Sequence, residues 1–329
     1  NVLAGDGALL GGKQVVLNTR GDITNSGSII GREVTQLTAQ ILTNSGYIQG
    51  NRVDLSARQD IYNTGGQLRG ESSLSLLAGR DITSQTTTRT DGTDRWLDRP
   101  AGMYVQAPNG TLTLSALNNI TLSATELSNA GENGTTSVQA GNDLRLESVA
   151  TRHSEHGDWG GGNTRDLTQQ ADVGTRITTP GAIALDAGRD ITARAAEVIA
   201  GGALTVQAGR DIRLTTGNAT TDLVEHSKQS SSGLLSKSSI ETHDEVHDRQ
   251  ALGATLSGNS VDIRAKHDVR IEAGNVVGTQ DVKVLAGNNL TVTTADETHH
   301  ETHLRKETQS GLLSSGGMGF TVGAKKESW

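Results

Sequence analysis

The pentapeptide "AGRDI" occupies residues 78–82 and recurs at residues 187–191 and 208–212. The last two copies begin 21 residues apart, and the same spacing separates the looser copies "AKHDV" at 265–269 and "AGNNL" at 286–290. An internal repeat of about 20 residues is the signature of a chain that stacks small structural units along one axis. The repeat therefore predicts a solenoid rather than a compact globular domain.

Two further markers support the period of about 20 residues and define a second, longer one. "TNSGSIIG" from Thr24 returns as "TNSGYIQG" from Thr43, 19 residues later. "SGLLSKSS" from Ser232 returns as "SGLLSSGG" from Ser310, 78 residues later, and 78 residues also separate corresponding AGRDI-like copies. The longer unit is thus two coils of 21 residues followed by an insert rich in Ser, Thr and His.

Side-chain polarity alternates within each coil. In "LTVQAGRDIRL" at residues 204–214, apolar side chains occupy every second position on both sides of the corner. This pattern is typical of a strand, a four-residue turn and a second strand, and it excludes a helical repeat. We predict an all-β, right-handed parallel β-helix of about ten coils, because parallel crossovers favour that hand. Its corners are expected near Thr19, Ala39, Ala57, Ala78, Ala116, Ala140, Ala187, Ala208, Ala265 and Ala286.

The corner sequence suggests a structural role for each of its residues. Ala fits inside the corner, Arg points to solvent and Ile re-enters the core. The glycines are expected to adopt a backbone conformation that other residues avoid, and the aspartates to bond the backbone of their own turn. These corner residues are Gly79, Gly188, Gly209, Asp81, Asp190 and Asp211. The side chains expected to point into the solenoid include Ile82, Leu114, Leu185, Val206, Ile212, Ile263 and Val284.

The composition narrows the class of protein. The 329 residues include 41 glycines, three prolines and no cysteine, and aromatic residues make up only 2%. Stability must therefore come from a regular hydrogen-bonded stack rather than from disulfides or an aromatic core. The net charge of −8 argues against nucleic acid as the main partner. No apolar run is long enough to span a membrane, and the chain begins at Asn1 without a signal-like segment, which suggests an internal piece of a longer protein.

Four polar inserts interrupt the coils, at about residues 83–109, 150–179, 216–257 and 294–329. We accordingly divide one continuous solenoid into plain coils over residues 1–82 and paired coils with inserts over residues 83–329. The inserts hold eight of the nine histidines, and they could be hairpins lying along the solenoid or loops. Recognition residues concentrate on segments that leave a rigid scaffold. The candidate binding residues are therefore Trp96, Tyr104, Trp159, His243, His247, His299, His300 and His303.

Three short motifs invite a more specific interpretation. The histidine sets in "ETHDEVHD" at residues 241–248 and "ETHHETH" at 297–303 could ligate a metal ion, but neither matches a zinc hydrolase. Solvated surface is the favoured interpretation, so we expect no metal and no cofactor. A pH response is a further hypothesis, because histidine titrates near pH 6.5. "RGD" at residues 20–22 resembles an integrin ligand, yet its Asp and the following Ile fit an ordinary repeat corner.

Catalysis is the less favoured alternative. Polysaccharide lyases and hydrolases also use β-helices, but they need clustered acids or calcium-binding carboxylates, usually with aromatic residues. Here the acids recur singly at equivalent corners, which indicates turn chemistry, and the Gly-x-Ser-x-Gly motif is absent. We predict no catalytic residues and no enzymatic activity.

The combination of these motifs resembles a known family. Coils with "TNSGxI" followed by "AGRDI" corners are similar to the filamentous haemagglutinin repeats of bacterial exoproteins that use two-partner secretion. The segment "ETHHETHLRKETQSGLLSSGGMGFTVGAKKES" at residues 297–328 resembles the second haemagglutinin repeat class. That class occurs in CdiA-type effectors of contact-dependent growth inhibition. The resemblance covers nearly the whole chain.

The resemblance implies a non-catalytic filament segment that supports adhesion or contact-dependent delivery of a toxin. It also implies export through an outer-membrane partner transporter, a secreted or cell-surface location with a transient periplasmic passage, and a receptor or outer membrane of a target cell as partner. Any toxin activity would belong to residues outside this chain. A stand-alone adhesin that binds glycan or matrix is the alternative that sequence leaves open.

Overall fold

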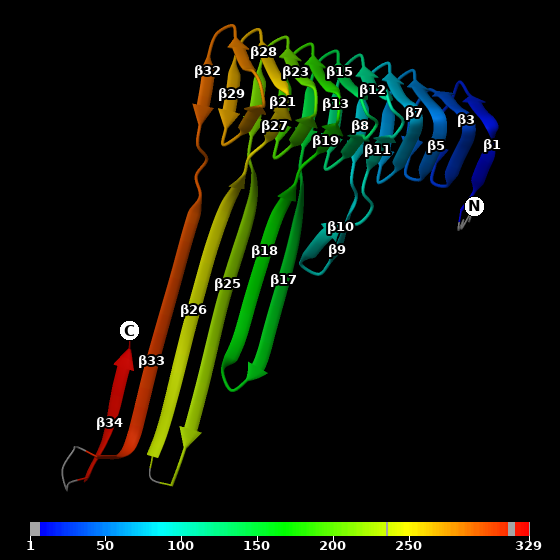
Figure 1. Cartoon of the computed structure of the whole chain (residues 1–329). Helices are drawn as coiled ribbons and strands as arrows, with labels where there is room; N and C mark the ends of the chain where they lie inside the picture. The colour runs from blue at the N-terminus through cyan, green and yellow to red at the C-terminus, as the bar shows by residue number, and fades with distance from the viewer. Residues whose placement is uncertain (1–6, 235, 315–319, 329) are drawn as a thin grey trace.

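The computed structural model describes residues 7–234, 236–314 and 320–328, and all regular structure within them is β-strand. Figure 1 shows two parts, a stack of coils and an arm of hairpins that projects from the side of the stack. Neighbouring coils pair in parallel throughout the stack. The predicted β-helix is therefore confirmed.

One wall of the stack is a ten-stranded parallel sheet, here named the short-strand sheet. Its spatial order is the chain order, so each coil contributes one strand. Each strand follows one of the ten predicted corners, which confirms the coil register in the described residues. The strands are β2 (Ile23–Asn25), β4 (Leu42–Asn44), β6 (Ile61–Thr64), β8 (Ile82–Gln85), β13 (Ile120–Ser123), β16 (Leu144–Glu147), β21 (Ile191–Arg194), β24 (Ile212–Thr215), β29 (Val269–Glu272) and β32 (Leu290–Thr293).

The remaining walls belong to a 16-stranded sheet, here named the long sheet. Its early coils each use one long strand: β1 (Leu9–Asn18), β3 (Ser28–Ala39), β5 (Tyr47–Ala57) and β7 (Gln67–Ala78). Later coils split this strand in two: β11 (Gly102–Val105) and β12 (Thr111–Ala116), β14 (Glu126–Asn129) and β15 (Thr135–Ala140), β19 (Arg176–Thr179) and β20 (Ala182–Ala187), β22 (Glu197–Ala200) and β23 (Ala203–Ala208), β27 (Thr255–Gly258) and β28 (Ser260–Ala265), β30 (Asn275–Gly278) and β31 (Val282–Ala286). The change occurs at β7, whose two halves pair separately with β11 and β12.

The arm is a third, eight-stranded sheet, here named the arm sheet, and all its pairings are antiparallel. Its order is β34-β33-β26-β25-β18-β17-β10-β9. The strands are β9 (Thr88–Asp91), β10 (Asp94–Leu97), β17 (Val149–Gly160), β18 (Asn163–Val173), β25 (Gly217–Ser232), β26 (Ser236–Leu252), β33 (Thr298–Ser314) and β34 (Phe320–Ser328). The inserts are thus hairpins, and they project from the solenoid and pair with one another instead of lying along it.

The predicted ends of three inserts are wrong. The strands β11, β19 and β27 fall inside the expected insert ranges, yet each pairs in the long sheet as part of a coil. Each is only four residues long, too short for its alternation to stand out beside a polar hairpin. Residues 315–319 and 329 of the fourth insert lie outside the described residues. The division of the chain at residue 82 stays a prediction.

The core is a narrow column of aliphatic side chains inside the coils. Of the seven side chains expected to point inward, six are at most 2% exposed: Ile82, Leu114, Leu185, Val206, Ile212 and Ile263. Val284 is half-buried and packs against the same cluster from the last long-sheet strand. The corner alanines also form one register line, in which Ala187, Ala208 and Ala265 are consecutive partners. Alternation in the sequence therefore located the core.

The corner aspartates bond the next coil rather than their own turn. The Oδ1 atom of Asp190 accepts a hydrogen bond from the backbone N–H of Asp211, 21 residues later, and Asp211 Oδ1 accepts one from Asp268. Asp81 does the same for Asn119. Asp22 accepts from the N–H of Ile41, which places the RGD aspartate in the same ladder. The expectation of a local turn bond is corrected, because the stacked turns offer these carboxylates a donor in the adjacent coil.

The corner arginines also act between coils. Arg210 donates from Nε to Asp190 Oδ1 at 2.8 Å, and Arg189 donates to Asp143 Oδ1 at 2.7 Å. Arg80 forms the equivalent pair with Asp60, which is almost fully buried. The expectation that these arginines point to solvent is therefore incomplete, because each guanidinium turns back along the stack to the preceding carboxylate.

The corner glycines are required by close packing between coils. No positive φ occurs at Gly79, Gly188 or Gly209, so the expected unusual backbone conformation is wrong. A Cβ atom on Gly209 would lie 2.0 Å from the carbonyl oxygen of Gly188, and one on Gly79 would lie 2.1 Å from that of Arg58. Only glycine lets one turn approach the backbone of the turn below it this closely.

A buried asparagine ladder explains the "TNSG" marker. Asn25 donates from Nδ2 to Asn44 Oδ1 at 2.9 Å, and Asn44 donates to Asn63 Oδ1 at the same distance. Asn63 in turn donates to the hydroxyl of Ser84. All four side chains are buried, so the ladder satisfies polar groups inside the solenoid wall while it fixes the coil register.

Candidate functional site: the arm sheet

The hairpins of the arm sheet leave the solenoid at regular intervals. They follow β8, β16, β24 and β32, which are alternate strands of the short-strand sheet. Neighbouring strands lie about 4.8 Å apart in any sheet, so two coils and one two-stranded hairpin both advance about 9.6 Å. One hairpin for every two coils therefore keeps the arm sheet commensurate with the stack. This match explains physically why the 78-residue unit contains two coils and one insert.

The arm is a single layer whose two faces are both accessible. Within its described side chains, only Val149 and Gly217 are buried, and both lie where the hairpins join the solenoid. A cross-strand row of Leu167, Leu223 and Val246 is half-buried and supplies apolar contact between hairpins. Most other positions are polar or charged. The arm is thus held together by backbone pairing and cross-strand side-chain pairs rather than by a core.

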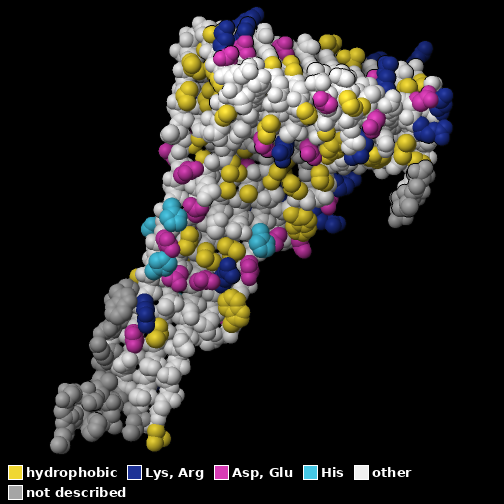
Figure 2. Space-filling view, in the orientation of Figure 1, with side chains coloured by type: hydrophobic (Ala, Val, Ile, Leu, Met, Phe, Trp, Pro, Cys, Tyr) yellow, Lys and Arg dark blue, Asp and Glu magenta, His cyan; other side chains and the backbone are white. Residues whose placement is uncertain are grey.

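Eight of the nine histidines lie on this sheet, and Figure 2 shows histidine and acidic side chains gathered on the arm. Register assigns them to two faces, because side chains alternate along each strand. One face, here named the histidine face, carries His226 opposite His243 and His247 opposite His300. Glu245 lies on the same face between these two pairs. The opposite face carries His299 and His303 of β33 together with their carboxylate partners.

On the histidine face, each pair has its own carboxylate. The rings of His226 and His243 are 5.9 Å apart between centroids and tilted by 58°, and His243 Nε2 lies 2.7 Å from Glu245 Oε1. The hydrogen bond with His243 holds the pKa of Glu245 below its usual value. His247 stacks on His300 at 6.5 Å with an interplanar angle of 12°, and its Nδ1 lies 2.9 Å from Asp222.

On the opposite face, carboxylates and imidazoles alternate in a line across β26 and β33. His303 lies 2.7 Å from Asp244 through Nδ1 and 2.6 Å from Glu301 through Nε2. Glu301 also approaches His299, which pairs with Asp248. A neutral imidazole has a single N–H, so only the imidazolium form of His303 can donate to both carboxylates. The bonds to Asp244 and Glu301 accordingly raise the pKa of His303.

The structure separates the aromatic candidates from one another. Trp96 on β10 and Trp159 at the end of β17 are exposed on the arm, with exposed fractions of 42% and 68%. Tyr104 is not on an insert, because it lies on β11 in the long sheet. There it donates to Glu126, and burial together with that bond raises its pKa to about 12. Tyr104 therefore belongs to the solenoid wall.

The ninth histidine lies at a corner. His267 stands in the "AKHDV" sequence where the three AGRDI corners carry Arg, and its Nδ1 lies 2.9 Å from Asp211 and 3.3 Å from Asp268. These three side chains could jointly contact a metal ion. Asp211, however, already pairs with Arg213 and accepts the N–H of Asp268. The contact between His267 and Asp211 takes the place of the Arg–Asp pair of the AGRDI corners, which makes a structural role the simpler account.

Two haemagglutinin repeat families match the chain. One matches residues 1–65, 50–94 and 105–165, and the other matches residues 160–240 and 234–328. Similar proteins include the 16S rRNA endonuclease CdiA of Enterobacter cloacae, 32% identical over 46% of this chain and 5% of that protein. A tRNA nuclease CdiA of Escherichia coli is 31% identical over 47% of this chain and 4% of its own length, and a toxin CdiA of Escherichia coli is 37% identical over 46% and 5%.

These relatives are far longer than the aligned segment. The chain aligns with about a twentieth of the length of each of the three. No solved structure matches the chain. Among the described residues, no helix has the length and apolar character that a membrane span requires.

Proposed function

Because this chain belongs to the haemagglutinin repeat family, we propose that it is a non-catalytic filament segment of a large secreted bacterial surface exoprotein. In this proposal the solenoid supplies length and the arm sheet supplies a contact surface. In this proposal the segment supports contact-dependent delivery of a toxin to neighbouring cells. The names of two relatives, a 16S rRNA endonuclease and a toxin, support the link to a toxin. The toxin activity itself resides outside these residues.

The observation that carries the proposal is the continuous arm sheet. Four separate inserts pair into one surface that both stands away from the solenoid and exposes two faces. Stability of the coils does not require such a surface, because the aliphatic core is already closed inside them. The arm sheet gains one hairpin for every two coils, so its surface extends along the filament. Such a surface suits contact with an extended partner, such as the envelope of a target cell.

The corner acids support a structural rather than a catalytic role. Hydrogen bonds from Arg80 and Arg210 hold the pKa values of Asp60 and Asp190 below their usual value. A general acid at neutral pH needs the reverse shift, since it must keep its proton. These carboxylates therefore serve as fixed anions of the inter-coil ladder.

The proposal includes an export route and a location. Two-partner secretion through an outer-membrane transporter would carry the chain across in an unfolded state, which its lack of cysteine allows. Coils can then form one upon another as they emerge, because each contacts only its neighbours. The folded segment would act at the cell surface, with the receptor or outer membrane of a target cell as its partner.

A stand-alone adhesin is the second candidate. The exposed indole rings of Trp96 and Trp159 favour it, because exposed aromatic rings on a polar surface suit stacking on glycan or matrix ligands. Replacing both by alanine would abolish binding to immobilised glycan if this candidate is correct. Delivery to cells would be unaffected by the same substitutions.

Binding of the fluorescently labelled chain to intact Gram-negative cells tests the main proposal. The matched variant replaces residues 221–248 by Asn-Gly between Thr220 and Arg249, which lie directly opposite each other in register. This change shortens the central hairpin and leaves β27 in the solenoid. Saturable binding that the variant loses supports the proposal. Absence of binding by the intact chain, or equal binding by both proteins, would contradict it.

A further inference from the structure

The junction between the first hairpin and the rest of the arm sheet contains a groove, here named the tryptophan groove. It crosses β10, β17, β18 and β25 and has a volume of about 540 Å³. This volume falls within the range of about 300–1,000 Å³ that is typical of small-ligand sites. The short strand β10, which is in register with β17 through the pair Arg95 and Arg152, brings Trp96 to the rim of the groove.

The strand register places two rows of side chains on one face of the groove. Arg95 and Arg152 are direct partners, so the side chains on either side of them in sequence point to the opposite face of the sheet. The pairing of β17, β18 and β25 extends both rows, which lie on the face opposite the histidine face. The first row is Trp96, Thr151, Ala171 and Ala219, and the second is Asp94, His153, Gln169 and Thr221.

The first row steps down from a large ring to small side chains. The indole of Trp96 is 42% exposed. Behind it the row continues with Thr151, Ala171 and Ala219, so the floor of the groove beside the ring is low. A sugar ring has an apolar face of C–H groups, and an indole beside a low floor offers that face a large contact area.

The second row supplies polar groups beside this apolar surface. Asp94 is held in place, because its Oδ1 accepts the backbone N–H of Ser154 at 2.6 Å and its Oδ2 lies 3.3 Å from His153 Nδ1. The amide of Gln169 can donate and accept, and so can the hydroxyl of Thr221. Sugar hydroxyl groups also donate and accept at once, so the second row matches the polar edge of a sugar ring.

The charge of the groove favours a neutral ligand. Arg95 and Arg152 contribute to its lining, but they form the row between the other two, so their guanidinium groups project toward the histidine face. Arg89 is the register partner of Trp96 and lies beyond it on β9, outside the lining. The carboxylate of Asp94 faces the groove and repels the acidic groups of sulfated or sialylated glycans.

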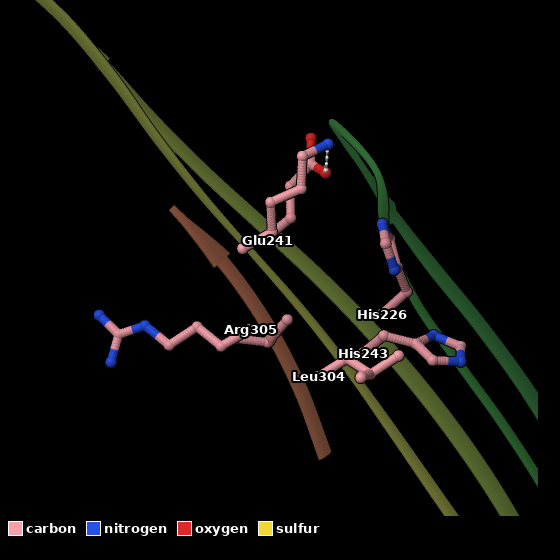
Figure 3. Close-up of a pocket in the computed structure, with 7 residues that line it drawn as sticks. His226, Glu241, His243, Leu304 and Arg305 are labelled. Carbon is pink, nitrogen blue, oxygen red and sulfur yellow. Dashed lines mark ion pairs between the residues drawn. The ribbon is translucent and has the colours of Figure 1, made fainter. Parts of the chain in front are cut away.

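The depression on the histidine face has a different chemistry. Figure 3 shows His226, His243 and Leu304 around it, with the side chain of Arg305 extending away. Lys306 also lines this depression. Imidazole rings and cationic side chains replace the indole and the row of small residues. The depression therefore serves as a comparison site within the same sheet.

We propose that the tryptophan groove binds a neutral oligosaccharide of a cell surface. The apolar face of one sugar ring lies on Trp96, and its hydroxyl groups bond Asp94, Gln169 and Thr221. The groove spans about 14 Å between its outer strands, which gives room for more than one sugar ring in line. This inference rests on the proposed function of the arm sheet as a contact surface, and it names the class of ligand that the surface recognises.

Binding of the fluorescently labelled chain to an array of immobilised neutral, sialylated and sulfated oligosaccharides tests the proposal. Binding should be confined to neutral members of the array. W96A should weaken it by about tenfold or more, since the indole supplies most of the apolar contact. W96F should retain part of the binding because a phenyl ring also offers an apolar face, and Q169A should weaken binding from the polar row.

Two matched controls separate the groove from the rest of the sheet. Trp159 is an exposed tryptophan of the arm outside the groove, and His243 lines the comparison site. W159A and H243A should therefore bind as the native chain does. Far-ultraviolet circular dichroism checks that each variant keeps its strands. Unchanged binding in W96A and Q169A, an equal loss in W159A or H243A, or a preference for sulfated or sialylated members would overturn the proposal.

The same variants distinguish this proposal from the broader one. Binding to intact cells that W96A and Q169A retain, but that the variant with the shortened central hairpin loses, would overturn the glycan site and leave the arm sheet as a contact surface. Binding to neutral oligosaccharides that W96A loses, in a chain that binds no cells, would support the glycan site and contradict the role in cell contact.

Discussion

Removing Asn44 from the buried asparagine ladder should destabilise the solenoid well beyond the loss of one contact. The Asn44 side chain is fully buried, accepts from Asn25 and donates to Asn63, both at 2.9 Å. In N44A, Asn25 keeps its bonds to the carbonyl groups of Gly27 and Tyr47, but Asn63 Oδ1 loses its side-chain donor. The substitution also removes the hydrogen bond from Asn44 Nδ2 to the carbonyl oxygen of Gly46. Three lost hydrogen bonds at ~1 kcal/mol each and an unsatisfied buried acceptor at ~1–3 kcal/mol give a loss of ~4–6 kcal/mol.

Urea unfolding followed by circular dichroism measures this change, with T43A as the control because Thr43 is adjacent and half-exposed. A double-mutant cycle with N63A sharpens the test. The second substitution should cost ~1–2 kcal/mol less in the N44A background, since its partner is already gone. A loss below ~0.5 kcal/mol in N44A, or strict additivity with N63A, would refute the ladder as a stabilising element.

Four other predictions concern the solenoid and the arm. I212D should cost more than ~3 kcal/mol of unfolding free energy by burying an unpaired charge, and unchanged melting would contradict the coil register. G209A should lower the melting temperature, because the added Cβ atom would collide with the backbone carbonyl of Gly188. An unchanged melting temperature would show that the coils stack less closely than described. The stability of the solenoid and that of the arm should depend on pH in opposite ways. Because the pKa of Asp190 is lowered in the folded chain, solenoid stability should fall as the pH drops through the folded pKa of this carboxyl group. R210Q should weaken this pH dependence in urea titrations between about pH 6 and pH 2.5. Because the pKa of His303 is raised in the folded chain, the pairing of β26 with β33 should be strongest below pH 6.5 and should weaken as the pH rises through the folded pKa. Hydrogen exchange of the β33 amides measures this pairing. If the exchange depends on pH as strongly in H303Q as in the native chain, His303 does not control the pairing.

The coils could be predicted from sequence because burial imposes a strict pattern on them. The alanines at residues 187, 208 and 265 mark the same corner in successive coils, and the structure pairs them as register partners. Each coil is also nearly equal in length to the next. A repeated corner in a parallel stack has only one consistent register, so local alternation was enough to fix the global arrangement.

The arm sheet could not be predicted in the same way. Its strands have no buried face, so they lack the alternation of polar and apolar residues that marked the coils. Val246 meets Leu223 across the hairpin, and Thr221 meets Gln169 in the neighbouring hairpin, yet nothing in either strand alone specifies these partners. The histidine pairs depend on the same register. The sequence singled out His243, His247 and His300 as candidates, but it did not indicate that His243 lies opposite His226 or that His247 lies opposite His300.

The reasons for the corner glycines and aspartates lay between coils rather than within them. A single corner is compatible with a local turn bond from Asp190 and an unusual backbone at Gly209. Stacking supplies a closer donor in the next coil and a carbonyl that leaves no room for a methyl group. The signal for this role was the repetition itself, because a residue that recurs at every coil faces its own copies.

Disulfide trapping between neighbouring hairpins tests the continuous arm sheet most directly. Gln169 of β18 and Thr221 of β25 lie 52 residues apart in sequence and are direct register partners, and the chain has no cysteine to interfere. Cysteines at directly opposed positions of adjacent strands are within disulfide reach, whereas Q169C with S227C, six residues further along β25, is not. Mild oxidation of the native protein should cross-link Q169C/T221C and leave Q169C/S227C free. Absence of the first cross-link, or equal cross-linking of both pairs, would contradict an arm built from paired hairpins.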